Sequence, residues 1–199
     1  MIWSATHSGA EPMPWSPREA ELLAVTLRLL QDGGYDGLTM DAVAATAHAS
    51  KATVYRRWPT KAELVLAAFV QGVRQVDVAP ETGSLRGDLL QLGNTCCAQA
   101  HEHGSTMRAI LVEVSRNPAL KDVMQHQFLD QRKALFERVL WQAVDRGEIE
   151  AAAITDELCD VMPGYLVFRS IWSARPLTRR SVTALVDEII LPSLKRRSG

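Results

Sequence analysis

The chain has 199 residues, of which 47% are apolar and 23% charged, and its formal net charge is −1. This length suits one large or two small domains, and the composition is that of a globular protein with a sizeable core. The sequence has no run near the roughly 18 to 20 apolar residues that span a bilayer, and its start lacks the basic and apolar pattern of a secretion signal. We therefore expect a cytoplasmic protein.

The first ordered element is predicted to begin at Ser16. Residues 1–15 are rich in Gly, Pro, Ser and Thr without periodicity, and we expect them to form a disordered arm. Ser16 and Glu19 have the spacing of a capping box, in which each side chain accepts a hydrogen bond from the other residue's backbone N–H. Leucines then recur at helical spacing as far as Gly33, which predicts a first helix over residues 17–32.

Two short helices separated by a tight turn are predicted next. Thr39 precedes an apolar stripe over residues 40–47 and can cap its first turn, and Ser50 can cap the helix that follows. Val54 and Trp58 stand at i and i+4 on that helix, so both are expected to bury against the preceding one.

The rest of the chain is predicted to be helical throughout. A second capping box, Thr60 with Glu63, opens a helix toward Val73. Beyond Ser84 no run alternates in polarity as a strand does, which predicts an all-α protein. Helix breaks are expected at Gly104, Asn117-Pro118, Gly147 and Pro176.

The last two predicted helices carry apolar stripes that need a broad apolar partner. The first stripe contains Leu158, Val161, Met162, Tyr165, Phe168 and Trp172, and the second contains Val182, Leu185, Val186, Ile189 and Ile190. Such stripes exposed on a monomer would be a liability, so they indicate a surface that another helix covers.

The pair of short helices has the arrangement of a helix-turn-helix, whose second helix places its first turns in the DNA major groove. At 100° per residue, Val54 and Trp58 point to the core while Ala52 and Arg56 point to the opposite side. The outward face is therefore small at its centre and polar at its edges, which suits docking against base edges.

The side chains of this face suit the two parts of a DNA duplex that a protein contacts, the base edges and the phosphates. Lys51 can reach guanine O6 and N7, Ala52 allows close approach, and Thr53 offers a methyl for thymine and a hydroxyl. Residues suited to phosphate oxygens are Tyr55, Arg56, Arg57 and Lys61.

The charge of this region is also distinctive. No acid lies between Asp41 and Glu63, so the four cations in between are expected to form an uncancelled positive patch in a nearly neutral chain. Residues 161–186 are a second acid-free stretch with several arginines, so charge alone does not indicate DNA. The coincidence of charge, two capped short helices and a small outward face favours DNA binding.

The stretch "GYDGLTMDAVAATAHASKATVYRRWPTKAELV" resembles the DNA-binding domain of TetR/AcrR-type transcriptional regulators, over about Ser16 to Phe69. The family pattern has a Thr that opens the second helix, Ser-Lys-x-Thr-hydrophobic-Tyr in the third, and Pro-Ser/Thr-Lys-x-x-Leu at the fourth. His48 departs from it, since the family commonly has Gly in this turn. If φ is positive there, His is among the better tolerated residues, and we expect an intact turn.

The resemblance implies that Thr39, Tyr55 and Lys61 grip phosphates and that residues 51–53 face the bases. It also implies a homodimer in which the last two helices of each chain form a four-helix bundle. The candidate DNA-binding residues are Thr39, Ser50, Lys51, Ala52, Thr53, Tyr55, Arg56, Arg57 and Lys61. The candidate dimer-interface residues are Leu158, Met162, Tyr165, Trp172, Val182, Leu185, Val186, Ile189 and Ile190.

The resulting expectation is a helix-turn-helix domain over residues 16–63 and a larger helical ligand-binding and dimerisation domain over residues 64–199. The resemblance implies a repressor that a small molecule releases from a palindromic operator. Candidate ligand contacts, chosen because Met and aromatic side chains adapt to apolar ligands, are Met107, Met124, Phe128, Trp141 and Phe168. The alternative for each of them is a place in the core.

Enzymatic and metal-dependent functions are not favoured. His101 and His103 are two residues apart and so do not share a helix face, and a polar helix end before Gly104 accounts for them. No catalytic or phosphate-loop motif occurs, and we expect no cofactor, metal or active site. The three cysteines, Cys96, Cys97 and Cys159, are expected to be reduced core thiols, with oxidant or metal sensing as the alternative.

Two alternatives to a DNA-binding regulator remain open. One is a helical interaction module whose basic patch meets an acidic protein, and the other is a small-molecule-binding helical protein without specific DNA binding. The first predicts indifference to DNA sequence, and the second predicts ligand binding alone.

Overall fold

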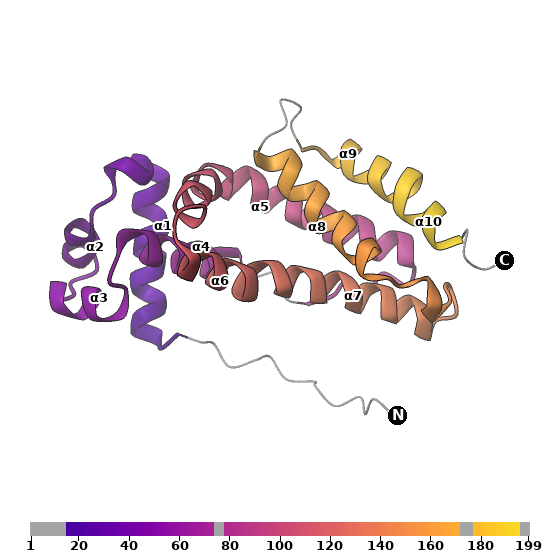
Figure 1. Cartoon of the computed structure of the whole chain (residues 1–199), viewed down its shortest axis with the longest axis horizontal. Helices are drawn as coiled ribbons and strands as arrows, with labels where there is room; N and C mark the ends of the chain where they lie inside the picture. Colours follow the sequence, from indigo (N-terminus) through magenta and orange to yellow (C-terminus); the bar gives the residue numbers. More distant parts are fainter. Residues whose placement is uncertain (1–14, 74–77, 172–176, 196–199) are drawn as a thin grey trace.

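The computed structural model describes residues 15–73, 78–171 and 177–195, and every regular element within these ranges is helical (Figure 1). Helices α1, Pro17–Gly37, α2, Met40–Thr46, and α3, Lys51–Arg57, form a head at one end of the molecule, and α4, Lys61–Val73, leads into the body. The body consists of α5, Leu85–Val114, α6, Pro118–Met124, the π-helical turn η2, Gln125–Leu129, α7, Asp130–Asp145, the short 3₁₀ turn η3, Ala151–Ala153, and α8, Asp156–Ile171. It ends with α9, Arg179–Ala184, the π-helical turn η4, Leu185–Ile190, and α10, Leu191–Lys195. The all-α prediction is confirmed.

The helices of the head begin where the capping residues predict. Ser16 and Glu19 form the expected reciprocal pair at the start of α1, and Thr39 accepts from the Ala42 N–H at the start of α2. Ser50 accepts from the Thr53 N–H at the start of α3. Thr60 and Glu63 make the reciprocal bonds of a capping box before α4. These starts were predictable because each depends on residues within one turn.

The predicted stop of the first helix at Gly33-Gly34 is confirmed by the non-helical backbone of Gly34, and α1 also includes a short further turn that ends at Gly37. Gly34 adopts φ 68°, a left-handed conformation that interrupts the helix and that a glycine accommodates without a Cβ clash. The helical path then resumes for a final turn.

The prediction of a break at Gly104 is wrong, because Gly104 lies inside the 30-residue helix α5. A glycine costs a helix interior about 1 kcal/mol relative to alanine, but α5 packs against α1, α4, α6, α7, α8 and α9, and this burial outweighs the local preference. The predicted break before Pro118 is confirmed, since Asn117 caps α6. The break at Gly147 is confirmed as well, with φ 74° just beyond α7. Pro176 lies outside the described residues.

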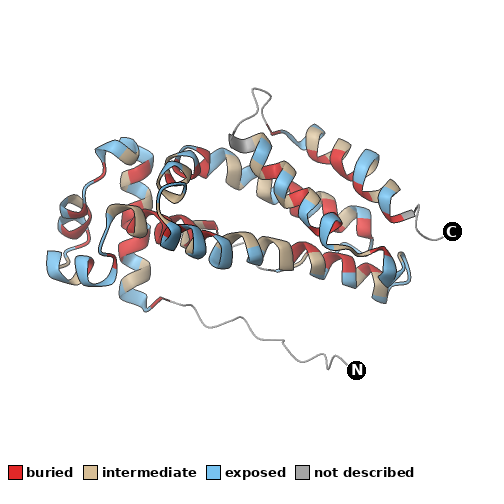
Figure 2. Cartoon of the chain, viewed as in Figure 1, coloured by how far each residue is buried: buried red, intermediate tan, exposed pale blue. Residues whose placement is uncertain are grey.

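Two hydrophobic cores lie at the two ends of α5. The first is built from the head, α4, the end of α5 and α6, and the second from the start of α5 with α7, α8, α9, η4 and α10. Figure 2 shows buried positions on the facing sides of these helices and exposed ones on the outer sides of α2 and α3. The predicted domain boundary after residue 63 falls in the first turn of α4, whose buried residues share the core of the head.

Candidate nucleic-acid interface and interior pocket

The turn between α2 and α3 is held by side chains that lie elsewhere in the chain. His48 has φ 50°, so the turn is left-handed at the position where the family commonly has Gly, as expected. The guanidinium of Arg18, on α1, donates to the backbone carbonyls of Ala47 and His48 at 2.5 and 3.0 Å. Arg18 therefore ties the turn to the first helix, a role that the sequence alone did not indicate.

The outward face of α3 lies as predicted. Val54 is 0% exposed and Trp58 3%, so both anchor the helix to the core, while Lys51, Ala52, Tyr55 and Arg56 are exposed. Ser50 is exposed at the helix start, Thr53 is half-buried, and their hydroxyl oxygens lie 2.8 Å apart. Thr39 is exposed at the start of α2. The base-facing and phosphate-facing candidates on α2 and α3 are thus open to a partner.

The predicted uncancelled patch of four charges is wrong in two positions. Lys51 Nζ lies 2.6 Å from the Asp41 carboxylate, and this ion pair raises the pKa of Lys51. Arg57 pairs with Glu19, a residue 38 positions earlier, and hydrogen bonds from the Ser16 N–H and from Arg57 lower the pKa of that carboxyl. Folding brings both acids close to the patch, although neither lies within the acid-free stretch of the sequence.

The remaining two cations of the patch are placed differently. Among the described residues no acid pairs with Arg56, whose side chain is exposed on α3. Lys61 Nζ lies 4.4 Å from the centroid of the Tyr35 ring, at the start of α4. Arg56 and Lys61 therefore carry charge that no described carboxylate neutralises.

Arg57 is integrated into the head itself. Its guanidinium carbon lies 4.8 Å from the Trp15 ring centroid and 5.7 Å from that of Trp58, and the two rings are 5.9 Å apart. Trp15 is buried, although it was included in the predicted disordered arm. We therefore assign Arg57 to holding the start of α1 against the end of α3, and not primarily to a phosphate.

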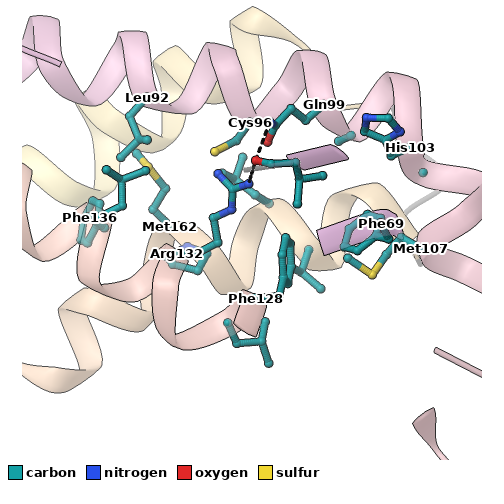
Figure 3. A pocket seen from close by; sticks show the side chains of 18 residues that line it. Phe69, Leu92, Cys96, Gln99, His103, Met107, Phe128, Arg132, Phe136 and Met162 are labelled. Atoms are coloured by element: carbon teal, nitrogen blue, oxygen red, sulfur yellow. Dashed lines mark hydrogen bonds between the residues drawn. The ribbon is translucent and has the colours of Figure 1, made fainter. Parts of the chain in front are cut away.

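An apolar pocket lies in the body between the two cores (Figure 3). It is lined by α4, α5, the η2 turn, α7 and α8, through the residues Phe69, Val73, Leu92, Cys96, Gln99, Ala100, His103, Gly104, Met107, Phe128, Leu129, Arg132, Leu135, Phe136, Met162, Pro163, Leu166 and Val167. The cavity volume is about 90 Å³, within about 760 Å³ of empty space that includes the open mouth.

Two of the five predicted ligand contacts, Met107 and Phe128, line this pocket. Met124 is buried in the core on the head side, and Trp141 and Phe168 are exposed on the surface, so these three do not line the pocket. Residue type alone cannot separate a pocket wall from a core or a surface. No pattern in the sequence indicated the polar residues of the pocket, of which Arg132 and Gln99 are the most important.

The polar groups of the pocket meet at the end of α4. Arg132 Nη2 and Gln99 Nε2 donate to the backbone carbonyl of Val73, the last residue of α4, at 2.5 and 3.0 Å (Figure 3). His103 stands edge-on to Phe69 with the ring centroids 6.4 Å apart, and it lies in the middle of α5 and not at the predicted helix end. Polar residues of the pocket therefore contact α4, the helix that joins the body to the head.

Six of the nine residues predicted for the dimer interface lie inside the protomer's own core: Leu158, Met162, Val182, Leu185, Val186 and Ile190. They come from α8, α9 and η4 and pack with residues of α5 in the second core, so they do not offer a surface to a second chain. Tyr165 is half-buried, Ile189 is 51% exposed, and Trp172 lies outside the described residues. Phe168, predicted for the pocket, is 56% exposed on α8 and belongs with the outward residues.

The described residues contain no group of three or more His, Cys, Asp and Glu placed to hold a metal ion. Within the same ranges no helix is long and apolar enough to cross a membrane.

Helix α3, the reading helix, is short and exposed at the head, and the head is joined to a helical body that contains a pocket. This arrangement is that of a helix-turn-helix transcriptional regulator. The family model described as "Bacterial regulatory proteins, tetR family" matches residues 22–68, and "Tetracyclin repressor-like, C-terminal domain" matches residues 79–189. The chain belongs to the TetR family of transcriptional regulators. This confirms the predicted family, its helix-turn-helix function and its non-enzymatic nature.

Similar proteins agree with this assignment. The chain is 69% identical over 95% of its length to an HTH-type transcriptional regulator of Mycobacterium tuberculosis, of which 94% is covered. It is 35% identical to a DNA-binding transcriptional repressor TetR of Mycobacteroides abscessus, over 87% of this chain and 92% of the relative. The crystal structure of TetR family transcription regulator SCO0332 matches with a TM-score of 0.77 and 26% identity, over 88% of this chain and 97% of that one.

Proposed function

We propose that this protein is a homodimeric repressor that binds a near-palindromic operator through α3 and leaves it when a small molecule fills the pocket. The observation that carries the proposal is the exposed face of α3, on which Ala52 is open, Thr53 is half-buried, and Val54 and Trp58 anchor the opposite side.

The DNA contacts divide into two kinds in this proposal. Lys51, Ala52 and Thr53 face the base edges, with Ser50 capping the helix that carries them. Thr39, Tyr55, Arg56 and Lys61 face phosphates, and Lys61 stands where the first turn of α4 also offers free N–H groups. Arg57 holds the end of α3 against the start of α1, which fixes the orientation of α3 within the head.

The dimer follows from the exposed apolar residues on the last helices. Phe168, on α8, and Ile189, in η4, are large apolar side chains with more than half of their surface exposed, and Tyr165 lies beside the former on the same helix. Burying them against a second copy would join α8 and the final helix of each chain. Ile189→Lys is expected to yield folded monomers in light scattering, with operator affinity lost. A dimer of unchanged stability would place the interface elsewhere.

The response to a ligand depends on α4. Its residues Leu64 and Val65 are buried in the core of the head, where α4 packs against α1, while Phe69 and Val73 line the pocket. A ligand that binds better when α4 is displaced shifts the dimer toward a spacing of the two heads that no longer fits DNA. The coupling free energy for such regulators is typically about 1 to 3 kcal/mol.

The test is binding of the purified full chain to DNA from its own upstream region, measured by fluorescence anisotropy across salt. If each dimer neutralises about 6 to 8 phosphates, log K should fall against log salt with a slope of roughly −5 to −7. Thr53→Ala should weaken the operator by about 1 to 3 kcal/mol while sparing random DNA. Lys61→Ala, the matched control, should weaken both alike.

Other results would contradict the proposal. Affinity that is equal for the operator and for random DNA would favour an interaction module that meets acidic surfaces. Ligand binding without any DNA binding would favour a small-molecule-binding protein.

A further inference from the structure

We propose that the pocket takes a small apolar molecule that bears one carboxylate, and that this carboxylate pairs with the guanidinium of Arg132. The proposal rests on the proposed function in treating the pocket as the ligand site, and it adds the chemical class of the ligand.

The side chain of Arg132 is incompletely satisfied. Its Nη2 donates to the Val73 carbonyl, while Nη1 is buried without a hydrogen-bond partner, and the guanidinium carbon lies 5.4 Å from the Phe128 ring centroid. No carboxylate of the described residues forms an ion pair with Arg132. A partly buried cation that lacks an anion, and whose Nη1 lacks a hydrogen-bond acceptor, is costly, and a ligand carboxylate supplies both.

The other polar groups of the pocket do not supply the missing negative charge. No Asp or Glu lines it, and its polar side chains besides Arg132 are Gln99, His103 and Cys96. Burial raises the pKa of the Cys96 thiol, although the charge of Arg132 opposes this, so the thiol is neutral near pH 7. Glu102, on the surface side of α5, lies 3.7 Å from His103 Nε2. Arg132 is thus the one permanently charged side chain that lines the pocket.

The rest of the wall is apolar and favours a hydrocarbon or aromatic body. Phe69 and Phe128 stand with ring centroids 5.1 Å apart on one side, and Met107, Phe136 and Met162 line the pocket with them. In Figure 3 the guanidinium of Arg132 points toward Cys96 and Gln99 among these apolar side chains. The arrangement fits one anionic end and one apolar body, and it disfavours a cation.

The position of Arg132 gives this chemistry a regulatory meaning. Arg132 and Gln99 share the Val73 carbonyl at the end of α4, so a carboxylate that draws the Arg132 guanidinium toward itself alters the contact that holds this helix end. Binding of an acid would therefore loosen or redirect α4, the element that packs against α1 in the head.

The test uses three probes that share one chain length and differ in their end group: octanoate, 1-octanol and octylammonium. Calorimetry on the full-length protein without DNA should show octanoate binding about 10- to 100-fold more tightly than 1-octanol, the range expected for a hydrogen-bonded charge pair, and octylammonium binding most weakly. Arg132→Met, which keeps apolar bulk but removes the charge, should abolish the preference for octanoate and leave the affinity for 1-octanol within about threefold. Arg116→Met, which removes a surface arginine at the end of α5, should behave as the wild type.

The folded state of each variant is checked by circular dichroism and by its melting temperature. If Arg132→Met does not fold, Arg132→Lys serves instead, because lysine keeps the charge but loses the planar fork, and an intermediate preference is expected. Equal affinity of the wild type for octanoate and 1-octanol, retention of the preference in the folded variant, or absence of octanoate binding up to about 5 mM would overturn the proposal.

Operator binding without probes is measured separately, so the two ideas fail independently. If octanoate binds but does not weaken operator binding, the proposed ligand class is supported and the proposed release from DNA by a ligand is wrong. If the protein binds the operator but does not prefer octanoate to 1-octanol, only the proposed ligand class is wrong.

Discussion

The Nη2 atom of Arg18, in the first turn of α1, donates a hydrogen bond to the backbone carbonyl of Ala47, 2.5 Å away, in the turn between α2 and α3. The same atom lies 3.0 Å from the carbonyl of His48, whose positive φ is unusual for a residue other than glycine. The long side chain of one helix thus stabilises the geometry with which the reading helix leaves the turn.

Replacing Arg18 by lysine should destabilise the head, because one ammonium group cannot reproduce a guanidinium whose Nη2 reaches both carbonyls while its Nη1 pairs with Glu21. Hydrogen bonds from a charged donor contribute about 1.5 to 3 kcal/mol each, and since the Arg18 side chain is 46% exposed we expect a loss of about 1 to 2 kcal/mol. Urea unfolding measures it. Arg28→Lys, an exposed change on the same helix, is the control and should cost less than about 0.5 kcal/mol.

Replacing Asp41 by asparagine should strengthen DNA binding at low salt. The carboxylate lies 2.6 Å from Lys51 Nζ and stands beside the reading helix, so its removal frees Lys51 and takes away one repulsive charge. A gain of roughly fivefold in affinity near 50 mM salt, fading as salt is raised, is expected in anisotropy titrations. Glu150→Gln removes an exposed acid in the body and should change nothing. Equal gains from both variants would mean that only the overall charge matters.

Replacing Gly93 by alanine should separate α5 from α9. A Cβ at this position would lie 2.5 Å from Val182 Cγ1, and Val182 is fully buried with a stiff, β-branched side chain. Overpacking of this kind costs about 1 to 3 kcal/mol, which thermal unfolding would detect. Gly33→Ala, where a Cβ meets nothing within 4 Å, should be neutral or stabilising. A stable Gly93→Ala protein would show that α9 shifts at little cost.

The three thiols should resist alkylation in the native protein. Burial raises the pKa of Cys159 to about 11, and it also raises the pKa values of Cys96 and Cys97. At pH 8 the thiolate fraction of Cys159 is then about 0.1%, so iodoacetamide labelling followed by mass spectrometry should be slow and should accelerate as pH approaches 11. All three should label quickly in guanidinium. Rapid labelling of the native chain at pH 8 would instead favour the oxidant-sensing alternative.

The raised thiol pKa also predicts how stability depends on pH. The folded state keeps the Cys159 proton at pH values where the unfolded thiol, with a pKa near 8.5, has lost it. Protons are therefore released on unfolding between about pH 9 and 11, and the free energy of unfolding should fall as pH rises through this window. Cys159→Ala should show a smaller fall in urea unfolding measured across the same window.

Sequence by itself determined what depends on neighbours along the chain. The helix starts at Ser16, Thr39, Ser50 and Thr60 were predicted because a cap forms within one turn. The outward face of α3 was predicted because helical periodicity fixes which side chains lie opposite the anchors. Since the reading helix is built only from these local rules, the family and its helix-turn-helix function were recognisable from the sequence.

Tertiary structure alone decided what depends on residues far apart in the chain. The continuity of α5 through Gly104 came from packing on six other helices, which outweighs a local propensity of about 1 kcal/mol. The partners of Lys51 and Arg57, the burial of six supposed interface residues in one protomer, and the meeting of Arg132 with the end of α4 also arise from this packing. Charge pairing and burial are set by distances in space, and no local pattern in the chain encodes those distances.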